Sequence, residues 1–152
     1  MKIILCIIVM QVLGGLGAFL TSGSIDSWYA ELKRPLGTPP NWVFGPVWAT
    51  LYAMIGASFA LVWHQLGNGF FKTSAAAVFA TQLILNLAWT PAFFGAHQME
   101  IALVIILAMI GAIVMTMRAF MKHSRPAAWL LAPYLIWVCY ATYLNAGYAL
   151  LN

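Results

Sequence analysis

Five long stretches of this chain carry no charged residue, and their length is the feature that most constrains the fold. They cover residues 3–20, 43–62, 75–94, 101–117 and 127–151. A helix of about 17–25 apolar residues crosses the hydrocarbon core of a bilayer. Lipid offers no partner for free backbone amides, so each crossing must be helical. The spacing predicts an all-α membrane protein, residues 1–152 forming a single bundle of five transmembrane helices with about those bounds.

Composition excludes the main alternatives to this architecture. The chain is 64% hydrophobic and only 7% charged, whereas an average soluble protein is about 25% charged. A soluble fold of this size could not cover so much apolar surface. The apolar stretches show no alternation of polar and apolar residues, which argues against a membrane β-barrel.

The charged residues are divided unequally between the two ends of such a bundle. Five crossings place Lys2, Lys72 and the basic residues of 118–125 on one side, without an acid. The other side carries Lys33 and Arg34 together with all three acids. Basic loops favour the cytoplasm, so we expect a cytoplasmic N-terminus and an external C-terminus. The net charge of +4 then reflects topology, and no nucleic-acid partner is expected.

The longest predicted loop, residues 21–42, combines aromatic, basic and proline residues. It contains Trp28, Tyr29, the basic pair at 33–34 and prolines at 35, 39 and 40. Proline fixes its own φ and restricts the residue before it, so the loop should be stiff. A stiff aromatic loop on the outer face is expected to be either a lid or a simple connector.

Two helix faces combine amides with aromatic rings inside the predicted membrane. The stretch 75–94 places on one face Gln82, Asn86, Trp89 and Phe93. The stretch 127–151 places on one face Trp137, Ala141, Leu144, Asn145 and Tyr148. An amide in hydrocarbon must find a partner or a wet cavity. Each face therefore predicts either ordinary helix packing with amide cross-links or part of a binding site.

Topology favours the binding site, because these faces can converge. Trp48, Asn86, Trp89 and residues 141–148 all fall in the outer half of the predicted bundle, on the side of the proline-rich loop. An apolar, aromatic pocket with a few amides is the usual composition of a small-molecule site. No predicted span contains a charged residue, which argues against ion-coupled transport. The three histidines are dispersed near helix ends, so no metal site is expected.

Several long motifs resemble one known family over nearly the whole chain and in the right order. They are WYAELKRP at 28–35, TPPNWVFGPVW at 38–48, NLAWTPAFFG at 86–95, PYLIW at 133–137 and ATYLN at 141–145. These segments are similar to the signatures of the translocator proteins, also called tryptophan-rich sensory proteins or peripheral-type benzodiazepine receptors. The resemblance suggests a bacterial member of the family, a multi-pass protein of the bacterial cell membrane.

The resemblance implies a five-helix bundle, commonly a homodimer, with a ligand pocket under the first loop. The pocket would accept porphyrins, haem-like tetrapyrroles and isoquinoline or benzodiazepine drugs, and no cofactor is required. The positions that match the family's pocket are Tyr29, Pro39, Phe44, Trp48, Asn86, Trp89, Trp137, Ala141 and Leu144. Some bacterial relatives degrade protoporphyrin with light and oxygen, and the resemblance assigns that catalytic role here to Trp48 and Trp137.

Three functions remain open on the sequence. The first is a membrane receptor or sensor that binds a porphyrin-type ligand. The second is a light- and oxygen-dependent enzyme that degrades it, and the third is a transporter of tetrapyrroles or sterols.

Overall fold

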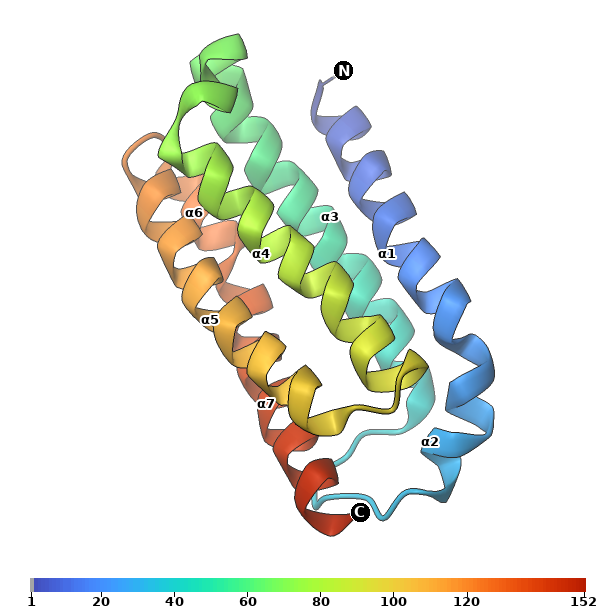
Figure 1. Cartoon of the computed structure of the whole chain (residues 1–152). Helices are drawn as coiled ribbons and strands as arrows, with labels where there is room; N and C mark the ends of the chain where they lie inside the picture. The colour runs from blue at the N-terminus through green and yellow to red at the C-terminus, as the bar shows by residue number, and fades with distance from the viewer. Residues whose placement is uncertain (1) are drawn as a thin grey trace.

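The computed structural model describes residues 2–152, except the side chains at positions 18, 20–22, 25 and 26, and every regular element in this part is helical (Figure 1). The long helices are α1 (Lys2–Asp26), α3 (Asn41–Leu66), α4 (Ser74–Thr90), α5 (Met99–Met121) and α7 (Ala132–Leu151). The short ones are α2 (Trp28–Glu31), the 3₁₀ helix η1 (Gly67–Lys72), the π-helix η2 (Pro91–Gly95) and α6 (Arg125–Leu130). The prediction of an all-α fold is confirmed.

Four helical segments are long and apolar enough to cross a membrane. They are Asn41–Lys72, Ser74–Gly95, Met99–Met121 and Arg125–Leu151. In α1 the described apolar stretch, Lys2–Gly17, is shorter than such a span. Four of the five predicted crossings therefore meet the requirement of length and composition, and a crossing by α1 stays a prediction.

Prolines set the breaks in two of these segments. At Pro91 the regular α4 ends and the chain continues as the wider turn of η2. Near Pro133 the helix is interrupted at Leu131, between α6 and α7. A proline lacks the N–H that continues the helical ladder, so each break has a local cause. A helix over the predicted stretch 43–62 would carry Pro46 in its first turn, but α3 starts at Asn41, so Pro46 lies in its second turn.

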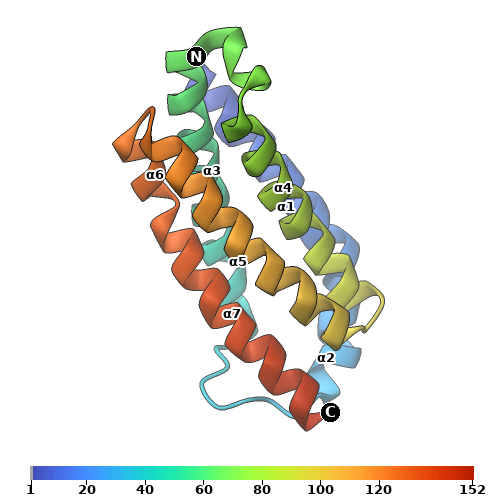
Figure 2. The ribbon, with the colours of Figure 1, turned by 60° about the vertical axis from the view of Figure 1, so that its left-hand side comes forward.

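The first loop is shorter than predicted. Helix α1 continues to Asp26 and α2 covers Trp28–Glu31, so only Ser27 and residues 32–40 of this segment lie outside a helix. The first proline of the segment is Pro35, and the chain stays largely helical until just before it. Figure 2 shows this loop running past the end of α7 to reach α3, with the two chain termini at opposite ends of the bundle in Figure 1.

Small residues let α1 pack closely against α3. A Cβ atom placed on Gly56 would lie only 2.8 Å from the Cα of Ile7 and 2.9 Å from the carbonyl oxygen of Cys6. A Cβ on Gly14 would overlap the ring of Tyr52. Small residues at helix contacts are typical of membrane bundles, and both positions show this close packing.

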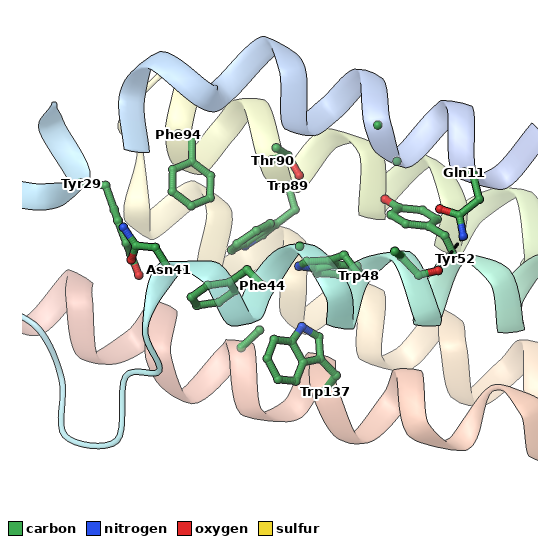
Figure 3. Close-up of a pocket in the computed structure, with 15 residues that line it drawn as sticks. Gln11, Tyr29, Asn41, Phe44, Trp48, Tyr52, Trp89, Thr90, Phe94 and Trp137 are labelled. Atoms are coloured by element: carbon green, nitrogen blue, oxygen red, sulfur yellow. Dashed lines mark hydrogen bonds between the residues drawn. The ribbon is translucent and has the colours of Figure 1, made fainter. Parts of the chain in front are cut away.

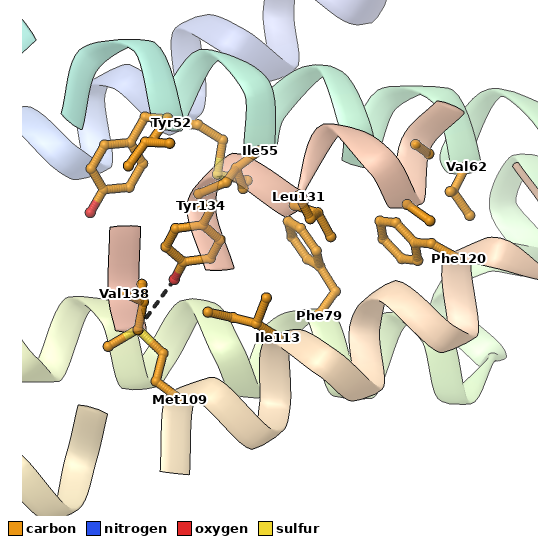
Figure 4. Packing of buried hydrophobic residues seen from close by; sticks show 14 of the residues in the cluster. Tyr52, Ile55, Val62, Phe79, Met109, Ile113, Phe120, Leu131, Tyr134 and Val138 are labelled. Carbon is orange, nitrogen blue, oxygen red and sulfur yellow. Dashed lines mark hydrogen bonds between the residues drawn. The ribbon is translucent and has the colours of Figure 1, made fainter. Parts of the chain in front are cut away.

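The half of the bundle near η1 and α6 is filled by phenylalanine and aliphatic side chains (Figure 4). Phe79 stacks on Phe120 with ring centroids 5.7 Å apart, and Phe59 contacts Phe79 at 4.9 Å and Phe70 at 5.2 Å. Offset and edge-on ring pairs at these distances are favourable. This dense packing fixes the helices that carry the site at the other end.

Candidate functional site

A cavity of about 330 Å³ lies among α1, α3, the end of α4 and α7, in the half of the bundle nearer α2 (Figure 3). Its volume is at the lower end of the range for small-molecule sites, roughly 300–1,000 Å³. The lining residues are Gln11, Gly14, Gly15, Tyr29, Asn41, Phe44, Gly45, Trp48, Ala49, Tyr52, Trp89, Thr90, Phe94, Trp137 and Ala141. Most of the wall is apolar, and aromatic rings from α2, α3, α4, η2 and α7 gather around it (Figure 3).

The aromatic rings of the wall hold one another in place. Phe44 meets Trp137 edge-on with centroids 6.0 Å apart. Trp48 contacts Tyr52 at 5.7 Å, and Trp89 lies almost parallel to Phe93 at 5.3 Å. Each of these wall rings packs against another aromatic ring, which fixes its orientation. The ring faces that border the cavity can therefore receive a flat molecule without rearrangement.

Two tryptophans of the wall differ in their polar contacts. The Nε1–H of Trp89 donates to Oδ1 of Asn145 at 3.0 Å, and the amide of Asn145 donates to the carbonyl of Met99 at 2.8 Å. The Nε1 of Trp137 is buried and has no hydrogen-bond partner among the described residues. An unpaired buried donor is costly, and the ring that carries this one lines the cavity.

The structure brings together six of the nine residues for which the sequence predicts ligand binding. The six that line the cavity are Tyr29, Phe44, Trp48, Trp89, Trp137 and Ala141. The tryptophans to which the resemblance assigns catalysis, Trp48 and Trp137, are both among them. Pro39, Asn86 and Leu144 are absent from the lining. The predicted convergence of these elements holds, and a role of any of them in binding or catalysis stays a prediction.

Asn86 lies behind the cavity wall and organises it. Its Oδ1 accepts a 2.5 Å hydrogen bond from the hydroxyl of Tyr52, and its Nδ2 donates to the hydroxyl of Tyr134 at 2.8 Å. The Tyr134 hydroxyl donates in turn to the sulfur of Met109 at 3.2 Å. The predicted need of this amide for partners is met by two tyrosines. Asn86 thereby fixes the ring of Tyr52, which does line the cavity.

Leu144 and Pro39 lie towards the end of the bundle. Leu144 is buried in a second cluster with Tyr29, Phe93 and Tyr148. Pro39 belongs to the half-buried part of the loop before α3. The loop that carries Pro39 is held against α7 by the hydrogen bonds from Tyr140 and Tyr143 to the carbonyls of Gly37 and Leu36.

Helix α1 forms one side of the cavity, although none of the residues predicted to bind a ligand lies on it. The additional lining residues are Gln11, Gly14, Gly15, Asn41, Gly45, Ala49, Tyr52, Thr90 and Phe94. One signal was present, because Gln11 is the only amide in the apolar stretch 3–20. Its Nε2 donates to the carbonyl of Ala49 on α3 at 2.6 Å. A lone amide in a predicted membrane span indicates a partner on a neighbouring helix.

The outer end of the site is formed by Tyr29 and its neighbours. Tyr29 is buried, accepts a 2.7 Å hydrogen bond from the hydroxyl of Tyr148, and contacts the ring of Phe94 at 5.4 Å. Burial raises the pKa of the Tyr29 hydroxyl above its ordinary value. Tyr29 therefore remains neutral at physiological pH. The guanidinium of Arg34 lies 5.9 Å from its ring.

These features define a class of protein: a multi-pass helical membrane protein with an aromatic cavity enclosed by its helices. Within the described residues, no group of three or more His, Cys, Asp or Glu side chains is arranged to hold a metal ion. The chemistry that the cavity wall offers is ring stacking and a small number of hydrogen bonds.

Comparison with known proteins identifies the family. The model of the TspO/MBR family matches residues 6–151, and the chain belongs to this family. It is 40% identical to the tryptophan-rich protein TspO of Archaeoglobus fulgidus over all of this chain and 97% of that protein. It is 45% identical to the translocator protein of Bos taurus, over 88% of this chain and 80% of the relative. It is 38% identical to the tryptophan-rich sensory protein of Cereibacter sphaeroides, over 88% and 84%.

Proposed function

We propose that this protein is a membrane receptor or sensor that binds a flat tetrapyrrole, such as a porphyrin or haem, in the cavity between α1, α3, α4 and α7. Isoquinoline and benzodiazepine drugs are proposed to occupy the same space. The single observation that carries the proposal is the set of tryptophans Trp48, Trp89 and Trp137 around one cavity. A conjugated ring stacks favourably on indole faces. Among the residues that line the cavity, these indoles offer the largest surface for binding a ligand.

Charge at the outer end supports a ligand with carboxylates. Lys33 and Arg34 are exposed and follow directly on the helix that carries Tyr29, a lining residue. Charge-assisted hydrogen bonds from such side chains to carboxylates are stronger than neutral ones. In this arrangement the ring lies among the tryptophans while its acidic groups reach the basic pair at the membrane surface.

We propose that α1 is the fifth crossing, with the N-terminus in the cytoplasm and the C-terminus outside. The location of the termini at opposite ends of the bundle supports an odd number of crossings (Figure 1). The close packing of α1 on α3 over Gly56 supports it as well. The homodimer that the family resemblance implies remains a prediction, which chemical cross-linking in membranes would test.

The test of the receptor is a titration of reconstituted protein with protoporphyrin, followed by tryptophan fluorescence and porphyrin absorbance. Replacement of Trp137 by alanine is expected to weaken binding by about 1 kcal/mol, the usual value of an aromatic contact. Trp48→Ala should act in the same direction. Trp129→Ala is the matched control, because Trp129 is 64% exposed and does not line the cavity. Titration curves unchanged by both cavity substitutions would refute the pocket.

A second function is photo-oxidative degradation of the porphyrin. It is favoured because Trp48 and Trp137 line the same cavity. Light-excited porphyrin would react with oxygen while an indole supplies or quenches a radical. Illumination of the complex in air tests this activity. If porphyrin absorbance decays no faster with the wild type than with a Trp48→Phe/Trp137→Phe protein that still binds, the protein is a binder only.

A further inference from the structure

Aromatic side chains pack together at the end of the cavity that faces the first loop. Tyr29, Phe93, Phe94 and Tyr148 form an interlocked group, with ring centroids 4.9 Å apart for the two phenylalanines and 5.1 Å for the two tyrosines. The hydroxyl of Tyr148 donates to that of Tyr29 at 2.7 Å. A ligand moving along the bundle axis would have to separate these rings.

The loop beyond this group is fastened to α7 at several points. Tyr140 donates to the carbonyl of Gly37 at 2.6 Å, and Tyr143 donates to that of Leu36 at 3.0 Å. The side chain of Asn152 accepts from the backbone N–H of Lys33 at 2.9 Å and donates to its carbonyl at 3.2 Å. Opening the loop would break all of these hydrogen bonds together.

The side of the cavity between α1 and α3 is closed only in its inner part. Gly56 lies against the backbone of Ile7, and the ring of Tyr52 fills the space beside Gly14. The side chain of Gln11 then crosses to the carbonyl of Ala49 at 2.6 Å (Figure 3). These contacts form the inner boundary of a gap between the two helices.

Outward of this boundary, three small residues line the cavity and are also exposed: Gly15 on α1, and Gly45 and Ala49 on α3. No described atom lies within 4 Å of a Cβ placed on Gly15 or on Gly45. Neither glycine has a positive φ, so the backbone does not require glycine at either position. This contrasts with Gly14 and Gly56, where a neighbour occupies the space.

We propose that the ligand reaches the cavity sideways from the bilayer, through an opening between α1 and α3 that is bordered by Gly15, Gly45 and Ala49. The neighbouring surface of α1 is apolar, with Val12 and Leu16 more than half exposed, as expected for a lipid-facing border. The ligand class follows: a flat molecule that dissolves in the bilayer, whose charged groups stay at the headgroup level. This inference rests on the proposed binding function and adds the route by which the ligand enters the cavity.

The kinetic test uses leucine to fill the opening. Gly15→Leu and Gly45→Leu are each compared with Gly111→Leu, since Gly111 is an exposed helical glycine on α5 that also has no described atom near its Cβ and does not line the cavity. Stopped-flow quenching by protoporphyrin is measured in lipid nanodiscs. Both opening variants should slow association about tenfold and should also slow dissociation, whereas damage to the cavity itself would speed dissociation. The Gly111→Leu protein should match the wild type.

A pair of loop variants separates the two routes. Tyr140→Phe and Tyr143→Phe remove the hydrogen bonds that fasten the loop while keeping the rings. The two substitutions are combined in one protein. If the ligand enters from the bilayer, its rates of porphyrin association and dissociation should stay close to those of the wild type. Rates that rise in the loop variant and stay unchanged in both glycine variants would overturn the proposal in favour of passage through the loop.

The opening can also be tested without a ligand. If porphyrin does not bind, that result counts against the proposed receptor function and not against the opening. A nitroxide is attached at Ala49→Cys in a protein whose Cys6 and Cys139 are replaced by alanine. Power-saturation EPR then compares collisions with oxygen and with a water-soluble nickel chelate. The label should resemble one at Ile84, which is 66% exposed on α4, and differ from one at Leu36 in the loop. Ready access of the nickel chelate to position 49 would refute an opening to lipid.

Discussion

The two halves of this bundle use aromatic residues in opposite ways. Near η1 and α6, phenylalanine rings pack on one another, as with Phe79 on Phe120, and leave the centre filled (Figure 4). Near α2, tryptophan and tyrosine rings stand around a cavity and are held from behind by amides. Phenylalanine has no polar atom to satisfy, so it suits a dense interior, whereas indoles and phenols need partners that fix their orientation. The comparison indicates that one half provides rigidity and the other provides a preformed space.

Removing a ring from the filled half should have the largest effect on stability. Phe79→Ala is expected to cost roughly 3 kcal/mol, at the low end for a buried phenylalanine because the surrounding lipid is itself apolar. The measurement is unfolding in mixed micelles, with Phe44→Ala in the cavity wall as the paired substitution. Phe44 is only half buried and already borders empty space, so its loss should cost less. Equal costs would remove the distinction between the two halves.

Two buried amides on α4 sharpen the comparison. Asn86 is held by two tyrosine hydroxyls, whereas neither polar atom of Gln82 has a partner among the described residues. Asn86→Leu should destabilise by about 2 kcal/mol, because it leaves the Tyr52 and Tyr134 hydroxyls without their amide partner. Gln82→Leu should be neutral or stabilising, since an unpaired amide is removed. The same unfolding assay measures both, and a larger cost for Gln82→Leu would contradict the hydrogen-bond assignment.

The fastening of the loop should contribute a smaller amount. Asn152→Ala removes the side-chain hydrogen bonds to the backbone of Lys33, which lies at an exposed site. A net loss of about 1 kcal/mol or less is expected. The expected signature is faster hydrogen exchange confined to residues 32–40, with the helices unchanged. Exchange that rises throughout α7 would show that Asn152 supports the helix and not the loop.

Trp137→Phe should have the smallest effect on stability and a selective effect on binding. The Nε1–H of Trp137 makes no hydrogen bond to a described residue, so its removal should leave the unfolding free energy within about 0.5 kcal/mol. Binding of a ligand with an acceptor should weaken by about 1 kcal/mol. Trp89→Phe is the contrasting case, because it breaks the hydrogen bond to Asn145. A large loss of stability in Trp137→Phe would indicate a partner for this indole inside the protein.

The sequence by itself determined the helices and much of the site's composition. Uncharged stretches of membrane length leave the backbone no alternative to helix, and prolines such as Pro91 and Pro133 end regular turns wherever they occur. A face is also local, so the spacing of Trp137 and Ala141 placed them together without knowledge of any neighbour. For these reasons the all-α fold could be predicted from the residues alone, whereas the nine pocket positions, six of which line the cavity, came from the resemblance to the family.

Only the tertiary structure decided which residues border the cavity and which stand behind it. Asn86 and Trp89 lie on the same face of α4, yet one binds tyrosine hydroxyls in the wall while the other lines the space. The contribution of α1 was hidden because glycines at 14 and 15 carry no side chain to mark a site. Their role depends on the distance to α3, which varies along the pair of helices. Distances between helices are set by packing across the whole bundle, and no local pattern in the sequence encodes them.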